Sequence, residues 1–94
     1  MPDTIAVQLE LSEYSGRFYI SDSAEMKFDV VEPATFVVTH TGVSLVHRGE
    51  GYAQTLFEAL IAYAKEHEIK IESRCSFIDK MFERHPELSR LWSK

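Results

Sequence analysis

The sequence predicts an α+β fold: a mixed, mostly antiparallel five-stranded sheet with two main helices. Apolar and polar residues alternate in short segments of the first 43 residues, which is the period of half-buried strands. From residue 52 onward, apolar residues recur at steps of three and four, the period of an amphipathic helix. A chain of 94 residues holds one hydrophobic core, so we expect a single domain over 1–94.

Three short strands are expected first, at about 4–11, 17–21 and 25–30, because every second side chain in each is apolar. Turn signals at 15–16 and 21–23 separate them. Such short connections predict an antiparallel meander.

The central strand is expected at 35–43, which is rich in β-branched residues in the manner of a strand buried on both faces. Gly42 is the candidate position for a bulge or bend where this strand ends. A helix over 52–67 and a strand over 69–74 complete a β-α-β unit.

A second helix is expected over 76–85, with Ser76 and Asp79 as an N-cap pair. The tail at 88–92 is expected to add a helical turn that docks Trp92.

Composition excludes several classes of function. Ten basic and fifteen acidic residues give a formal charge of -5, which opposes nucleic-acid binding. Cys75, the single cysteine, cannot form an internal disulfide, and the N-terminus lacks a signal-peptide pattern, so we expect a cytoplasmic protein. No apolar run approaches the roughly 20 residues that span a bilayer, so no membrane association is expected. The histidines and Cys75 lack metal-ligand spacing, so no metal is expected either.

The loop at 47–53, His-Arg-Gly-Glu-Gly-Tyr-Ala, carries the main functional signal. Unpaired backbone N–H groups and a positive dipole at a helix start attract phosphate. Gly49 and Gly51 permit close backbone approach, and Arg48 can add a charge-assisted contact, so we expect a ligand with a pyrophosphate. A tight turn without a ligand is the alternative. No Lys-Ser or Lys-Thr follows Gly51 as in a P-loop, and the third glycine of a dinucleotide fingerprint is missing.

The pattern Arg-x-x-Gly-x-Ala at 48–53 resembles the acetyl-CoA motif of the GNAT N-acetyltransferases. Three further motifs extend this resemblance to a short single-domain GNAT-related family: His-Thr-Gly-Val-Ser at 40–44, Cys-Ser-Phe at 75–77 and Arg-His-Pro-Glu at 84–87. The resemblance covers about residues 16–87.

The resemblance implies a minimal GNAT (acyl-CoA N-acyltransferase) fold. Its sheet splays open beside the strand ending near Val43, and the pantetheine arm of acetyl-CoA (coenzyme A) lies in the gap. By the same resemblance, the backbone near Thr41, Gly42 and Val43 contacts the acyl and pantetheine region. The amides that would hold the pyrophosphate belong to Arg48, Gly49, Glu50, Gly51, Tyr52 and Ala53.

Two residues are candidates for catalysis. Cys75 stands at the start of the second helix, whose dipole favours a thiolate, although a lone cysteine is often only a small buried hydrophobe. The resemblance places Cys75 beside the acyl group, as a general base or a transiently acylated nucleophile. His40 alternates with Phe36 and Val38. It is either a hydrogen-bonded core residue or, if it faces the cleft, a group that accepts the amine proton or orients Cys75. Many GNAT enzymes protonate the departing thiolate with a tyrosine of the last helix, but the corresponding residue here is Phe82.

The expected function is acetyl-CoA-dependent N-acetyl transfer to an unidentified acceptor, an amine. The short chain and the missing tyrosine leave an alternative, an acyl-CoA-binding module or sensor without transfer. A small structural or partner-binding domain is a third reading. The acidic charge favours a cationic amine. We expect a monomer or a weak homodimer, in which an exposed aromatic such as Trp92 serves the contact.

Overall fold

A computed structural model describes residues 6–32 and 34–93. They form one five-stranded sheet whose strands follow the order of the chain. The strands are β1 (Gln8–Leu11), β2 (Ser15–Ile20), β3 (Ala24–Val31), β4 (Thr35–Val43) and β5 (Lys70–Ser73). The first four are antiparallel, and β5 runs parallel to β4. The predicted meander and β-α-β unit are confirmed, whereas the first residues of the strand predicted at 4–11 lie outside the described part.

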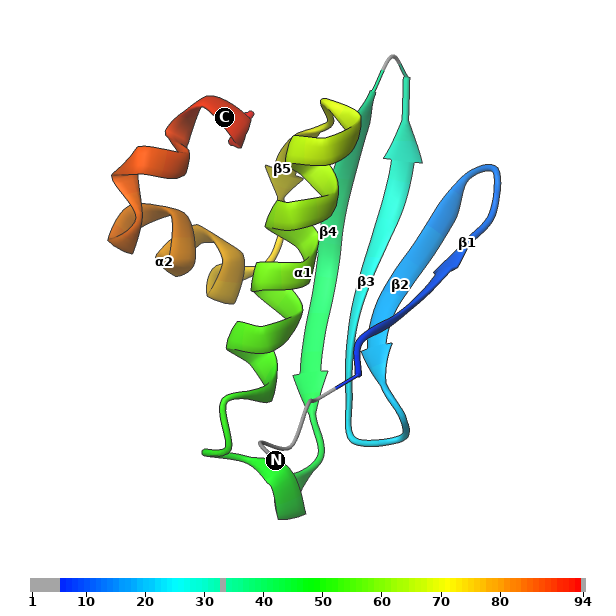
Figure 1. The fold of residues 1–94 in the computed structure, drawn as a ribbon, viewed down its shortest axis with the longest axis vertical. Helices are drawn as coiled ribbons and strands as arrows, with labels where there is room; N and C mark the ends of the chain where they lie inside the picture. The colour runs from blue at the N-terminus through cyan, green and yellow to red at the C-terminus, as the bar shows by residue number, and fades with distance from the viewer. Residues whose placement is uncertain (1–5, 33, 94) are drawn as a thin grey trace.

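Two main helices accompany the sheet, α1 (Tyr52–His67) and α2 (Ser76–Arg84), with short 3₁₀ helices η1 (Leu45–His47) and η2 (Pro86–Leu91). Helix α1 has the predicted bounds. It covers one face of the sheet, called here the inner face, while α2 and η2 lie beyond β5 (Figure 1). In the described ranges, no helix is long and apolar enough to cross a membrane.

Aromatic side chains organise the core between α1, α2 and the inner face. The rings of Phe28 and Phe36 stack with their centroids 4.1 Å apart. Phe82 of α2 packs edge-on against Phe57 of α1 and stacks on Trp92 at 5.1 Å. The predicted docking of Trp92 is therefore confirmed. Trp92 is half-buried, so the expectation that it is an exposed aromatic is wrong, whereas its part in a homodimer stays a prediction.

Strand β4 differs from the prediction in three respects. The middle strand of the sheet is β3, and β4 lies between β3 and β5. Only the first half of β4 is buried on both faces, since Phe36, Val37 and Val38 are buried but Thr39 and His40 are exposed. The bulge is also not at Gly42.

The pairing of β3 with β4 locates the bulge at Thr39. Phe28 pairs with Val38 and Lys27 pairs with His40, so Thr39 is an extra residue without an opposite partner. An inserted residue reverses which side chains face each side of a strand. The alternation of β4 therefore changes phase between Val38 and His40.

The start of α2 also differs from the prediction. The N-cap is Cys75, not Ser76, and its side chain makes no capping hydrogen bond. Ser73 instead fixes the turn. The Cys75 N–H donates to Ser73 Oγ at 3.2 Å, and the Ser73 hydroxyl donates to the Cys75 carbonyl at 2.9 Å. These two bonds hold Cys75 at the junction between β5 and α2.

Candidate active site

The sheet opens between β4 and β5. Their paired residues end with Val38 and Ser73, and the last bond across them runs from the Arg74 N–H to the Val38 carbonyl at 2.9 Å. Beyond this point β4 continues to Val43 with β3 on one side and no β5 residue paired on the other. The opening therefore begins at the Thr39 bulge.

Cys75 and Thr41 meet at this opening. Thr41 pairs with Met26, which is fully buried, so Thr41 belongs to the inner face. The thiol of Cys75 donates to Thr41 Oγ1 at an Sγ–Oγ1 distance of 3.6 Å. The contact brings two predicted site residues together across the gap between the strands.

His40 lies on the opposite, outer face. It pairs with the exposed Lys27 and is itself exposed. A Cβ added to Gly42 would meet His40 Nε2 at 2.8 Å, so the imidazole lies over the position where Gly42 has no side chain. The prediction that His40 shares a face with Phe36 and Val38 is wrong, because the bulge at Thr39 reverses the alternation. His40 is therefore not placed to orient Cys75.

The loop before α1 leaves backbone donors available. Gly49 and Gly51 have φ values of 85° and 82°, in the left-handed region that favours glycine. Gly51 is the N-cap of α1 and has no side chain to accept from the first turn, which also contains no acidic residue. The first-turn N–H groups of an α-helix have no intrahelical acceptor. This helix start therefore suits an anion such as a phosphate.

A cavity of about 340 Å³ joins this loop to the end of β4. Every predicted cofactor residue except Glu50 lines it, together with His47 and Gln54. Glu50 turns its carboxylate to His47, with 3.3 Å between Oε1 and Nδ1. His47 also stacks on Tyr52, with ring centroids 5.2 Å apart. His47 belongs to the predicted loop but was not among the individual binding residues expected from the sequence, and Gln54, the residue after the motif, was missed.

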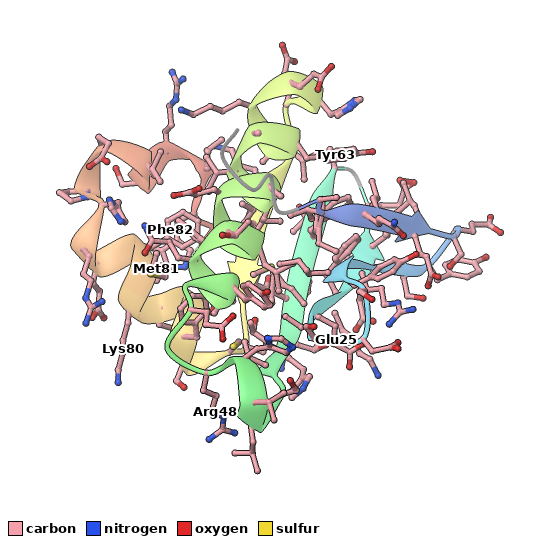
Figure 2. The ribbon with its side chains drawn as sticks, turned by 60° about the horizontal axis from the view of Figure 1, so that its bottom comes forward. Glu25, Arg48, Tyr63, Lys80, Met81 and Phe82 are labelled. Atoms are coloured by element: carbon pink, nitrogen blue, oxygen red, sulfur yellow. The ribbon has the colours of Figure 1, made fainter. Side chains whose placement is uncertain are left out.

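Arg48 and Phe82, two further residues discussed from the sequence, lie in different surroundings. Arg48 extends from the loop into solvent, whereas Phe82 lies between the helices with 1% of its surface exposed (Figure 2). Phe82 thus belongs to the core and carries no hydroxyl. Among residues 6–32 and 34–93, no three His, Cys, Asp or Glu side chains cluster in a way that could hold a metal ion.

A sheet that opens between two parallel strands, with an uncapped helix start at the same opening, defines the acyl-CoA N-acyltransferase class of fold. Residues 17–91 match the family described as GCN5-related N-acetyl-transferase, and the chain belongs to this family.

The solution structure of a GCN5-like protein from Staphylococcus aureus is similar, with a TM-score of 0.67 and 29% sequence identity. The match covers 92% of this chain and 87% of that one. A comparison with curated proteins gives no match. The predicted family, fold class and assignment as an acetyltransferase are confirmed.

Proposed function

We propose that the chain transfers an acetyl group from acetyl-CoA to an amine. The observation that carries the proposal is that one cavity contains both the uncapped start of α1 and the β4 residues beside the gap. A single elongated ligand can therefore place its anionic part on the helix and its reactive end between β4 and β5. An acyl thioester of coenzyme A has this layout.

The pyrophosphate would be held by the first-turn amides of Tyr52, Ala53 and Gln54. A negative charge at a helix N-terminus is stabilised by about 0.3–1 kcal/mol at an exposed site. Arg48, an exposed residue of the same loop, can donate a hydrogen bond to the charged pyrophosphate, and such a bond contributes about 1.5–3 kcal/mol. Together these contacts favour an anion at the loop despite the acidic charge of the whole chain.

When bound, acetyl-CoA supplies an activated acyl group at the gap. We assign different steps to His40 and Cys75 because they lie on opposite faces of β4. His40, exposed on the outer face, accepts the proton of the incoming amine. Cys75, which already donates its proton to Thr41 on the inner face, protonates the departing sulfur. This division gives Cys75 the task that Phe82 has no hydroxyl to perform.

Calorimetric titration with acetyl-CoA tests the donor site. We expect Arg48→Ala to raise the Kd about tenfold, the equivalent of 1.4 kcal/mol. Arg84→Ala is the matched control, since Arg84 is equally exposed at the far end of α2, and its Kd should equal that of the wild type. Absence of binding at millimolar acetyl-CoA would refute the proposal.

Mass spectrometry separates transfer from binding alone. The protein is incubated with acetyl-CoA and a panel of amines, and both the intact protein and the amines are weighed. We expect acetylated amine, reduced in Cys75→Ala without a change in acetyl-CoA affinity. Binding of acetyl-CoA with neither a Cys75 adduct nor any acetylated amine would instead identify an acyl-CoA-binding module.

A further inference from the structure

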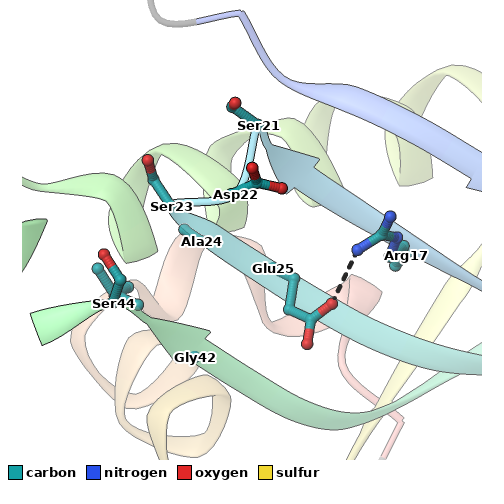
Figure 3. A pocket seen from close by; sticks show the side chains of 9 residues that line it. Arg17, Ser21, Asp22, Ser23, Ala24, Glu25, Gly42 and Ser44 are labelled. Atoms are coloured by element: carbon teal, nitrogen blue, oxygen red, sulfur yellow. Dashed lines mark hydrogen bonds and ion pairs between the residues drawn. The ribbon is translucent and has the colours of Figure 1, made fainter.

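A second cavity lies on the outer side of the end of β4 (Figure 3). Its volume is about 380 Å³, and its walls come from the turn between β2 and β3, from Arg17 and Glu25, and from residues 42–44. Gly42 and Val43 line both this cavity and the one beside the α1 loop. The end of β4 is thus the partition between the two cavities.

The charges in this outer cavity favour a cation. Arg17 pairs with Glu25, with 3.0 Å between Nη1 and Oε1, and with Glu10, with 2.9 Å between Nε and Oε1. Lys27 Nζ lies 3.9 Å from Glu25 Oε2, so these two cations and two carboxylates balance one another. Asp22, in the turn, makes no ion pair with any residue that the structure describes. One carboxylate is left over, in a chain that is itself acidic.

A polar group independent of these charges also lacks a partner there. Ser44 lines the cavity, and its Oγ is shielded from solvent with no hydrogen-bond partner among the described residues. The Ser44 backbone N–H, by contrast, donates to the Ser23 carbonyl at 2.7 Å. A buried hydroxyl without a partner is unfavourable, and rotation about the Ser44 Cα–Cβ bond would turn it toward a ligand with N–H donors in the cavity.

The proposed base borders the same cavity. The His40 imidazole lies over Gly42, and Gly42 forms part of the cavity wall. An amine bound in the cavity would therefore lie between His40, near one end of the cavity, and Asp22, in the turn at the other end. The acyl group, on the other side of β4, would be reached through the gap that begins at Thr39.

We propose that the outer cavity binds the acetyl acceptor, and that this acceptor is an alkyl amine carrying a second positive charge, such as a small polyamine. The inference rests on the proposed function. The reacting nitrogen must be neutral to attack, so it cannot be the group that an ion pair holds. The second ammonium pairs with Asp22 and, once the Ser44 side chain has rotated toward it, donates to Ser44 Oγ. As the amine nitrogen bonds to the acetyl carbon, the carbon–sulfur bond breaks. The amine proton passes to His40 and a proton reaches the sulfur, giving the amide and free coenzyme A.

Binding is tested by NMR titration of the full chain with spermidine, and with n-butylamine as the singly charged control. Spermidine should shift the amide signals of residues 21–25 and 42–44, and n-butylamine should shift them at least about tenfold more weakly at equal concentration. Spermidine shifts confined to other residues, or equal effects of the two amines, would overturn the assignment.

Kinetics then show whether bound spermidine is an acceptor. Asp22→Asn should raise the KM for spermidine about tenfold with kcat unchanged, and Asp29→Asn, an exposed carboxylate outside the cavity, should leave both unchanged. An unchanged KM in Asp22→Asn would contradict the inference while leaving acetyl transfer intact. Failure of the wild type to bind acetyl-CoA by calorimetry would instead contradict the proposed function.

Discussion

The first half of β4 belongs to the core, whereas the second half borders the proposed active site. Residues 35–38 have β3 on one side and β5 on the other, and their apolar side chains are buried. Residues 39–43 keep only β3, and they contain the bulge, the exposed His40 and the shared wall of two cavities. In this small fold, β4 therefore lacks a second neighbouring strand in the half whose side chains contribute least to the core.

The largest expected effect comes from the paired half. Phe36→Ala should lower the free energy of unfolding by about 3–5 kcal/mol, because the ring is buried and stacks on Phe28. Urea denaturation followed by circular dichroism measures this loss. A loss below about 1 kcal/mol would mean that the paired half is not the stable one.

The open half should behave in the opposite way. His40→Gln should lower kcat about 10²-fold, the usual contribution of a general base, with the free energy of unfolding unchanged within about 0.5 kcal/mol. Steady-state kinetics and urea denaturation give the two values. His67→Gln, an exposed position at the end of α1, is the control and should leave kcat unchanged. If His40→Gln lowered the free energy of unfolding as much as Phe36→Ala, both halves of β4 would contribute to stability, and the comparison would fail.

Gly42→Ala sharpens the comparison within the open half. The new methyl group would meet His40 Nε2 at 2.8 Å, so the imidazole has to move. If His40 is the base as proposed, moving its imidazole without removing it should lower kcat about tenfold. Adding Gly42→Ala to His40→Gln should then have no further effect on kcat, as a double-mutant cycle would measure. Full additivity would show that Gly42 acts independently of His40.

The smallest expected effect concerns an ion pair outside β4, between Glu10 of β1 and Arg17 of β2. It tests whether a contact far from the open half affects stability without affecting kcat. A hydrogen bond and charge from Arg17 hold the pKa of the Glu10 carboxyl below its ordinary value. Because the folded-state pKa is lowered, the pair stabilises the fold above the ordinary glutamate pKa of about 4.3 and loses this contribution as the pH falls through the folded-state value. Glu10→Gln should flatten the acid side of the stability curve measured by thermal denaturation, with kcat at neutral pH unchanged. An identical acid limb in both proteins would show that the pair does not contribute.

The local sequence pattern predicted the helices and strands of this fold. It did not predict on which face of the sheet the candidate site residues lie. The bounds of α1 followed from the apolar period beginning at Tyr52, and β-branched content marked β4. The bulge at Thr39 has no local signature, since it arises from the register with β3, and the face of His40 depends on it. The outer cavity could not be predicted from the sequence either, because its walls come from the turn at Asp22 and from the end of β4, which are far apart along the chain.

The order of the strands has a consequence for folding kinetics. Four strands pair with their chain neighbours through short turns, whereas β5 reaches β4 only after the whole of α1 has crossed over. Contacts between residues far apart in sequence require the larger loop closure and form more slowly. We therefore expect the opening beside Cys75 to assemble last. Catalytic competence during refolding should lag behind the formation of the meander.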